Sequence, residues 1–132
     1  MAHAYFGNFM RRTRVMKRED HGRLVDDAES AGLLSDREAA ELLWADLIVR
    51  GRRKSNDDEV YLAVEVSWTI GESDVERAAR RAALLARIKS PALAVAAGKF
   101  LSEEVSARAR DENVWLFVEG TPHPPDRHDI GP

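Results

Sequence analysis

The sequence has no cysteine and no apolar run that approaches the ~20 residues needed to cross a bilayer. The lack of cysteine excludes disulfide scaffolds and thiolate zinc sites, and we expect a cytoplasmic protein on that basis. The start, MAHAYFGNFMRRTR, places apolar residues before basic ones and so lacks the order of a secretory signal. The sequence also contains neither a glycine-rich phosphate loop nor a Ser/His/Asp set.

Charges of both signs are abundant and nearly balanced. The 132 residues are 44% hydrophobic and 33% charged, with a formal net charge of −3. This length suits one domain with a real core and is too short for two. Because a dedicated nucleic-acid binder is usually basic overall, any such partner must meet a local basic patch.

Two runs rich in β-branched and apolar residues, 47–49 and 60–66, flank the polar loop SNDDE and predict an antiparallel hairpin of 46–53 with 60–68. Only one parity of pairing places Leu47 and Val49 on the face of the apolar residues in the second run. That parity puts Asp46 and Glu65 on one face. With the loop centred near residues 56–57, Asp46 lies opposite Ser67 and diagonal to Glu65.

The remaining elements alternate helix and strand. Residues 18–31 predict a helix that ends near Gly32, and Ser35 to Glu38 form a capping box that opens a second helix to residue 43. Residues 74–88 and 102–113 predict two further helices, and 92–97 and 114–118 predict buried strands. This order favours right-handed crossovers and a mixed sheet with helices on both sides. The proline-rich segment 121–132 is interpreted as a disordered tail.

Two carboxylates on one sheet face need compensation. A divalent cation is one solution, since Mg²⁺ is commonly held by one or two carboxylates plus waters. The alternative is that Asp46 and Glu65 lie at the sheet rim, solvated or paired with Arg50 or Arg52. In the tail, His123, Asp126 and His128 suggest at most adventitious metal binding.

Asp46, followed by Glu65-Val66-Ser67 on the next strand and a helix from Asp74, resembles the core of the PD-(D/E)xK, or restriction-endonuclease-like, superfamily. The resemblance covers roughly residues 36–118 and implies an α/β fold with an α-β-β-β-α-β core, its mixed sheet flanked by helices. The run VYLAVEVSWTI is similar to uncharacterised bacterial members, some of which carry an N-terminal coiled coil. On that basis 1–120 is a single nuclease-like domain, and 1–17 a remnant of a longer N-terminal segment.

The resemblance implies a Mg²⁺ or Mn²⁺ site at Asp46 and Glu65, with the Val66 carbonyl as a further ligand. Ser67 stands where the family has lysine, and a hydroxyl cannot supply that positive charge. Arg77, near the start of the following helix, is the best-placed substitute, although helix charges are usually solvated. In such folds a preceding helix can present another acid, and by position only Glu38 and Glu41 qualify.

Two basic clusters are candidates for contact with nucleic acid. One lies in 11–18, and the other consists of Arg50, Arg52, Arg53 and Lys54 on the arm of the hairpin. The first cluster can equally be a solvated terminal segment. The second can equally protect an edge strand from intermolecular pairing.

Three functions fit these patterns. The first is a Mg²⁺-dependent nuclease, with Asp46, Glu65, Ser67 and Arg77 as its catalytic residues. The second is an inactive nuclease-like domain that serves as a protein- or nucleic-acid-interaction module or forms a homodimer, which the serine at position 67 favours. The third is a structural or adaptor domain whose carboxylates are surface groups. Fold does not fix function, so the resemblance does not separate the first two.

Overall fold

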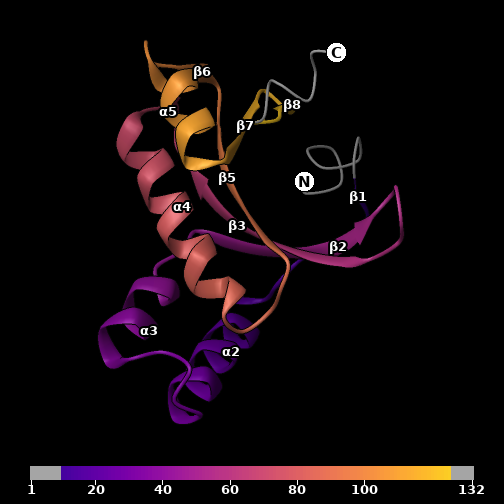
Figure 1. Ribbon diagram of the computed structural model, residues 1–132, viewed down its shortest axis with the longest axis vertical. Helices are drawn as coiled ribbons and strands as arrows, with labels where there is room; N and C mark the ends of the chain where they lie inside the picture. The colour runs from indigo at the N-terminus through magenta and orange to yellow at the C-terminus, as the bar shows by residue number, and fades with distance from the viewer. Residues whose placement is uncertain (1–9, 126–132) are drawn as a thin grey trace.

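The computed structural model describes residues 10–125. Within that range, six strands form one mixed sheet in the order β1-β2-β3-β5-β7-β8, and a small second sheet pairs β4 with β6 (Figure 1). The strands are β1 Met10–Val15, β2 Leu47–Arg53, β3 Glu59–Val66, β4 Thr69–Ile70, β5 Ala92–Gly98, β6 Phe100–Leu101, β7 Val114–Val118 and β8 Thr121–His123. The helices are α2 Arg18–Ser30, α3 Asp36–Leu43, α4 Glu72–Ala86 and α5 Val105–Glu112.

The predicted hairpin is confirmed, with its parity. Strands β2 and β3 are antiparallel neighbours, and Leu47 pairs with Val64 while Val49 pairs with Leu62. The register differs by two residues from the one expected, because the loop is centred near residues 55–56 rather than 56–57. The observed pairing extends to place Asp46 opposite Glu65 rather than opposite Ser67.

Residues 10–15 form a strand, which the sequence did not predict. Strand β1 pairs antiparallel with β2 and is the edge of the sheet. The edge-protection interpretation of the cluster on β2 is therefore wrong, because β2 is an interior strand. The periodicity of MRRTRV is obscured by a β-bulge between Arg11 and Arg14, which breaks the alternation that identifies a strand.

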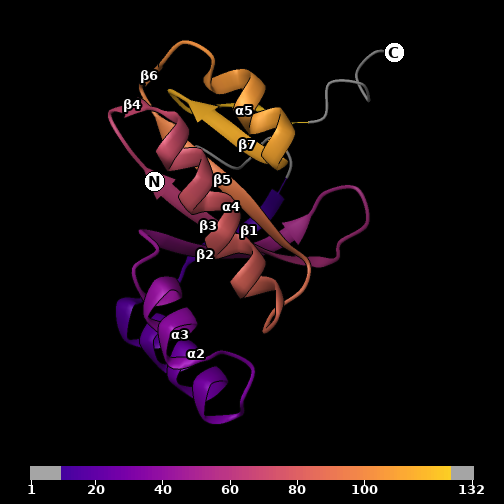
Figure 2. The same ribbon diagram turned by 60° about the vertical axis from the view of Figure 1, so that its left-hand side comes forward.

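Parallel pairing of β3 with β5 and of β5 with β7 confirms the crossover order. Helices on both sides of the sheet were expected. Over residues 10–125, however, α2, α3, α4 and α5 all contribute to the same core cluster, on the face that carries Ile48, Ala63 and Ala96. The opposite cluster, around Leu62 and Phe117, contains no helical residue. Successive crossovers of one hand that advance in one direction across a sheet place their helices on one face, as Figure 2 shows for α4 and α5.

Helix ends follow the local capping chemistry. The Ser35 hydroxyl accepts from the Glu38 amide at 3.1 Å, and the Ser35 amide donates to the Glu38 carboxylate at 2.9 Å, which confirms this capping box. The helix expected from Asp74 begins earlier, at Glu72, because the Gly71 amide donates to the Asp74 carboxylate at 2.9 Å. Helix α5 begins at Val105, later than expected, after Glu104 adopts a left-handed conformation.

The segment expected to be a disordered tail begins with strand β8, which pairs with β7 through residues 121–123. Proline is tolerated there because β8 is the edge strand opposite β1. None of the helices in residues 10–125 combines the length and apolar character that a bilayer crossing requires. The expected features of residues 1–9 and 126–132, including Asp126 and His128, lie outside the described residues.

Candidate functional site

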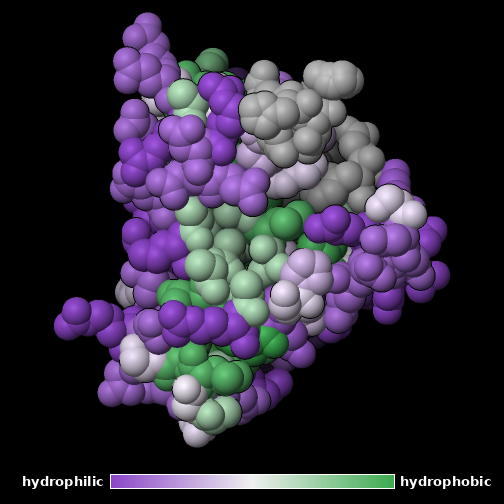
Figure 3. Space-filling model, in the orientation of Figure 1, coloured by the Kyte–Doolittle hydropathy of each residue, from purple (hydrophilic) through white to green (hydrophobic). Residues whose placement is uncertain are grey.

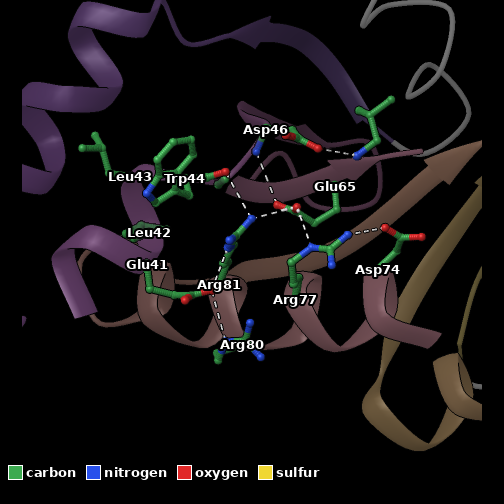
Figure 4. A network of polar contacts seen from close by, with 12 residues as sticks. Glu41, Leu42, Leu43, Trp44, Asp46, Glu65, Asp74, Arg77, Arg80 and Arg81 are labelled. Carbon is green, nitrogen blue, oxygen red and sulfur yellow. Dashed lines mark hydrogen bonds and ion pairs between the residues drawn. The ribbon is translucent and has the colours of Figure 1, made fainter. Parts of the chain in front are cut away.

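A buried ion-pair network joins β3 to α3 and α4 (Figure 4). The Glu65 side chain is only 2% exposed and faces α4. Arg81 Nη1 donates to Glu65 Oε1 at 2.8 Å, and Arg77 Nε lies 3.6 Å from the same oxygen. Arg81 Nε in turn donates to Glu41 Oε2 on α3 at 2.8 Å. The carboxylate of Glu65 is therefore compensated by two guanidinium groups of the protein itself.

Asp46 lies beside Glu65, but its carboxylate has a different partner. The Asp46 amide donates to Glu65 Oε2 at 3.3 Å, while Asp46 Oδ2 accepts from the Val66 amide at 2.8 Å. Asp46 thus extends the β2–β3 hydrogen-bonding ladder by one side chain at the point where β2 begins. This bond satisfies a strand amide and fixes the entry of the hairpin.

Burial raises the pKa of Glu65 above its ordinary value, and the charge and hydrogen bond of Arg81 act in the opposite direction. Glu41 differs. Its partial burial alone would raise its pKa, but hydrogen bonds from Arg81 and then Arg80, together with their charges, bring the pKa below its ordinary value. Both shifts belong to a network that serves the packing of α3 and α4 on the sheet.

The other residues that the resemblance singled out are also engaged. The Ser67 hydroxyl donates to the Thr69 carbonyl at 2.9 Å. Arg77 reaches Glu65, as its proposed replacement of the family lysine requires, but it also pairs with Asp74. Glu38 is held by its capping box and by Arg87 at 2.8 Å. Glu41 is held by Arg80 and Arg81.

These donors do not fit a divalent cation as they stand. Mg²⁺ needs carboxylate oxygens that are free to enter its octahedral shell, usually together with several waters. Glu65 is buried and offers its oxygens to Arg81 and to the Asp46 amide, and one Asp46 oxygen accepts from the Val66 amide. In the part of the chain that the structure describes, no group of three or more acidic or histidine side chains could hold a metal ion. A metal site at Asp46, Glu65 and Val66 stays a prediction.

The second feature of interest is the ribbon formed by β1 and β2, where the two basic clusters meet. Arg11 pairs directly across the strands with Arg52, and Arg14 pairs with Arg50. Like charges at directly opposite positions destabilise a sheet. Arginine pairs at two such positions therefore point to a use for the charge. We call this surface the basic ribbon, and its members are Arg11, Arg12, Arg14, Lys17, Arg50, Arg52, Arg53 and Lys54.

The β-bulge creates this arrangement. Arg11 and Arg14 are three residues apart, so in a regular strand they would point to opposite faces. Their partners Arg52 and Arg50 are two residues apart, and the extra residue on β1 brings all four arginines to one face. Arg12, inside the bulge, has a φ of 58°. Bulges that redirect side chains occur preferentially at edges and near functional sites.

Little within the described residues neutralises the ribbon. Arg11 pairs with Asp57 at 2.6 Å, and Arg52 donates to the Asp57 carbonyl at 2.9 Å. The hydrogen bond from Arg11 lowers the pKa of Asp57 below its ordinary value, so this acid stays charged. The other ribbon cations have no ion pair within residues 10–125. The hydrophilic tip of the hairpin stands out at the right of Figure 3.

Arg18 does not belong to the ribbon, although it lies in the 11–18 cluster. Its guanidinium turns toward α3, where it donates to the Leu43 carbonyl at 2.9 Å and the Ala45 carbonyl at 3.2 Å. It also lies 2.9 Å from Nδ1 of the buried His21. Arg18 thus anchors α2 to α3, and sequence alone could not separate it from its basic neighbours.

An exposed aromatic patch lies just beyond the end of β3, where the chain enters β4 beside β6. Trp68 and Phe100 are 69% and 49% exposed, with ring centroids 6.0 Å apart, and Lys99 Nζ lies 5.0 Å from the Trp68 ring. A surface of this kind suits contact with another protein. The expected homodimer stays a prediction.

Comparisons with family models, with curated proteins and with solved structures found no match.

Proposed function

We propose that this chain is a restriction-endonuclease-like domain that binds nucleic acid through the basic ribbon and does not cleave it. The observation that carries the proposal is the assembly of two basic clusters, about 40 residues apart in sequence, into cross-strand arginine pairs on one face. Phosphate contacts by Lys and Arg supply most of the sequence-independent affinity of proteins for nucleic acid. A two-stranded ribbon is also a known way of presenting such side chains to a groove.

The balance of charge supports this use of the ribbon. The protein carries a net charge of −3, yet the first acidic residue of the sequence is Glu19. The positive charge is therefore concentrated on β1, β2 and the segment after β1, and three acids, Asp57, Asp58 and Glu59, lie next to it in the hairpin loop and at the start of β3. A local basic surface on an acidic protein directs a polyanion to one place.

The geometry at Glu65 supports binding without chemistry. Activation of water by a metal needs a bound cation with an open coordination position. Glu65 instead closes the Glu41–Arg81–Glu65–Arg77 network, and Ser67 supplies no positive charge. The hairpin followed by a helical crossover is consistent with the element order that the resemblance implies, with the acids now serving the packing of α4.

Fluorescence anisotropy with labelled single- and double-stranded DNA and RNA tests the proposal. We expect binding that weakens steeply with salt, with a slope in log Kd against log[salt] of about 0.9 for each phosphate neutralised on a duplex. Arg50→Gln and Arg52→Gln should each weaken binding and reduce that slope by about one. The matched control is Arg110→Gln, an exposed arginine on α5 that has no ion pair within residues 10–125.

Equal loss of binding in Arg110→Gln and Arg50→Gln would show a diffuse charge effect and contradict a site at the ribbon. Absence of salt-dependent binding to all four nucleic acids at low ionic strength would overturn the proposal. Metal-dependent cleavage by the wild type would show that the domain is an enzyme.

A further inference from the structure

A recess at the inner end of the basic ribbon gathers three cations from three parts of the chain. Arg14 comes from β1, Lys17 precedes α2, and Arg50 comes from β2. Val15, Met16 and Asp20 complete its lining, and its volume is about 410 Å³. This volume lies within the range of small-molecule sites in proteins, ~300–1,000 Å³.

Within residues 10–125 the three cations have no ion pair and no side-chain hydrogen bond, so their charges are available to a ligand. The single acid in the lining, Asp20, is already engaged, because Arg23 Nη1 donates to its carboxylate at 3.0 Å. The recess therefore presents three free positive charges against one compensated negative charge. Arg14 and Arg50 are direct cross-strand neighbours, so their side chains leave the sheet side by side on the same face.

We propose that this recess binds a terminal phosphate monoester of a nucleic-acid strand. A monoester carries about −1.5 to −2 charges at pH 7, whereas an internal diester carries one, so three converging cations favour the monoester. Planar guanidinium forks bind phosphate oxygens in bidentate fashion, and the lysine adds a point charge. This inference rests on the proposed function, because the strand reaches the recess along the ribbon.

The position of the recess favours a strand end over a passing strand. Strand β1 ends at Val15 and α2 begins at Arg18, so the start of α2 forms a wall at this end of the ribbon. Lys17 is the N-cap residue of α2, and its side chain accepts no hydrogen bond from the first helical amides. These amides and the helix dipole therefore favour an anion at this end of α2. The three cations carry the assignment, and the helix end only reinforces it.

The test compares three oligonucleotides of one sequence, with a 5′-phosphate, a 3′-phosphate or no terminal phosphate, each labelled at the end away from the phosphate. We expect one phosphorylated form to bind the wild type at least about tenfold more tightly than the unphosphorylated form. Arg14→Gln and Arg50→Gln should each remove this preference. The matched control, Arg52→Gln, removes a ribbon cation on the same face but outside the recess and should weaken all three oligonucleotides equally. The preference should also fade below about pH 6, where the monoester takes up its second proton.

Equal binding of all three oligonucleotides to the wild type would overturn the recess proposal and leave the ribbon proposal standing. No binding of any of them would overturn both. Adenosine monophosphate alone is the second arm. If it binds as tightly as the phosphorylated strand and is unaffected by Arg52→Gln, the recess serves a free nucleotide and the strand-end proposal is wrong.

Discussion

Glu65 and Arg81 form a buried ion pair, with Arg81 Nη1 2.8 Å from Glu65 Oε1 and side chains that are 2% and 10% exposed. Removing one partner of such a pair leaves an uncompensated buried charge and typically costs about 3–5 kcal/mol. The Arg81 guanidinium also contacts Glu41 and the Trp44 carbonyl, so it joins α3 to α4 and to the sheet. This pair is a structural element of the fold.

The first prediction concerns the coupling of this pair. Arg81→Met and Glu65→Leu should each lower the free energy of unfolding by about 3–5 kcal/mol, while the double variant should lose clearly less than the sum. Chemical denaturation of the four proteins measures the coupling energy. Additive losses would mean that the two charges are compensated independently of each other.

The second prediction concerns His21, which is buried under α3. Arg18 Nη1 can only donate, so Nδ1 of His21 accepts from it at 2.9 Å and Nε2 donates to the Leu42 carbonyl at 3.0 Å. Burial lowers the pKa of His21 below its ordinary value of 6.5, the Leu42 carbonyl opposes the shift, and the Arg18 charge adds to it. The folded protein therefore holds the neutral ring.

The sign of the pH effect follows from this shift. Because the unfolded chain binds the proton more readily, the stabilisation is present above pH 6.5 and is lost as the pH falls through the lowered folded pKa. Between pH 7 and pH 5, the wild type should lose stability relative to His21→Gln, whose side chain does not titrate. Urea denaturation at several pH values measures this difference. A difference that does not change with pH would show that His21 titrates alike in both states.

The third prediction compares two glycines. A Cβ at Gly98 would lie 2.3 Å from the Ser67 carbonyl oxygen and 2.8 Å from Ile70 Cγ1, so Gly98→Ala should destabilise the protein by about 1–3 kcal/mol. At Gly22, inside α2, a Cβ would meet nothing within 4 Å, so Gly22→Ala should stabilise it by about 0.5–1 kcal/mol. Thermal denaturation of both variants checks the opposite signs. An unchanged melting temperature in Gly98→Ala would mean that the close contact of Gly98 with Ser67 and Ile70 can widen at no cost in stability.

The fourth prediction concerns metal and chemistry. Calorimetry should detect no Mg²⁺ or Mn²⁺ binding, and labelled DNA and RNA should remain intact with either metal. Ser67→Lys restores the lysine position that the resemblance implies, yet it should remain inactive, because Glu65 stays paired with Arg81. Metal-dependent cleavage that Asp46→Ala abolishes would instead establish the nuclease function.

Much of the local structure could be predicted from the sequence. The hairpin follows from two β-branched runs around a polar loop, and its parity follows because only one pairing keeps Leu47 and Val49 with the apolar residues of β3. The Ser35 capping box and the strand from Ala92 also follow from short-range rules. Such features depend on residues that are neighbours in the chain.

The use of each charge was decided by the tertiary structure. The motif identifies Glu65 as a candidate site residue, but its partner Arg81 comes from another element, 16 residues further on, and belongs to no motif that would mark it. Strand β1 was missed because its bulge interrupts the alternation of MRRTRV. The same bulge places Arg11 opposite Arg52 and Arg14 opposite Arg50. The sequence by itself determined the hairpin, the two buried strands and the approximate extent of the helices, and how rich in charge these segments are. Which charges are buried against each other and which remain free for a ligand depends on contacts between distant segments, which only the folded chain brings together.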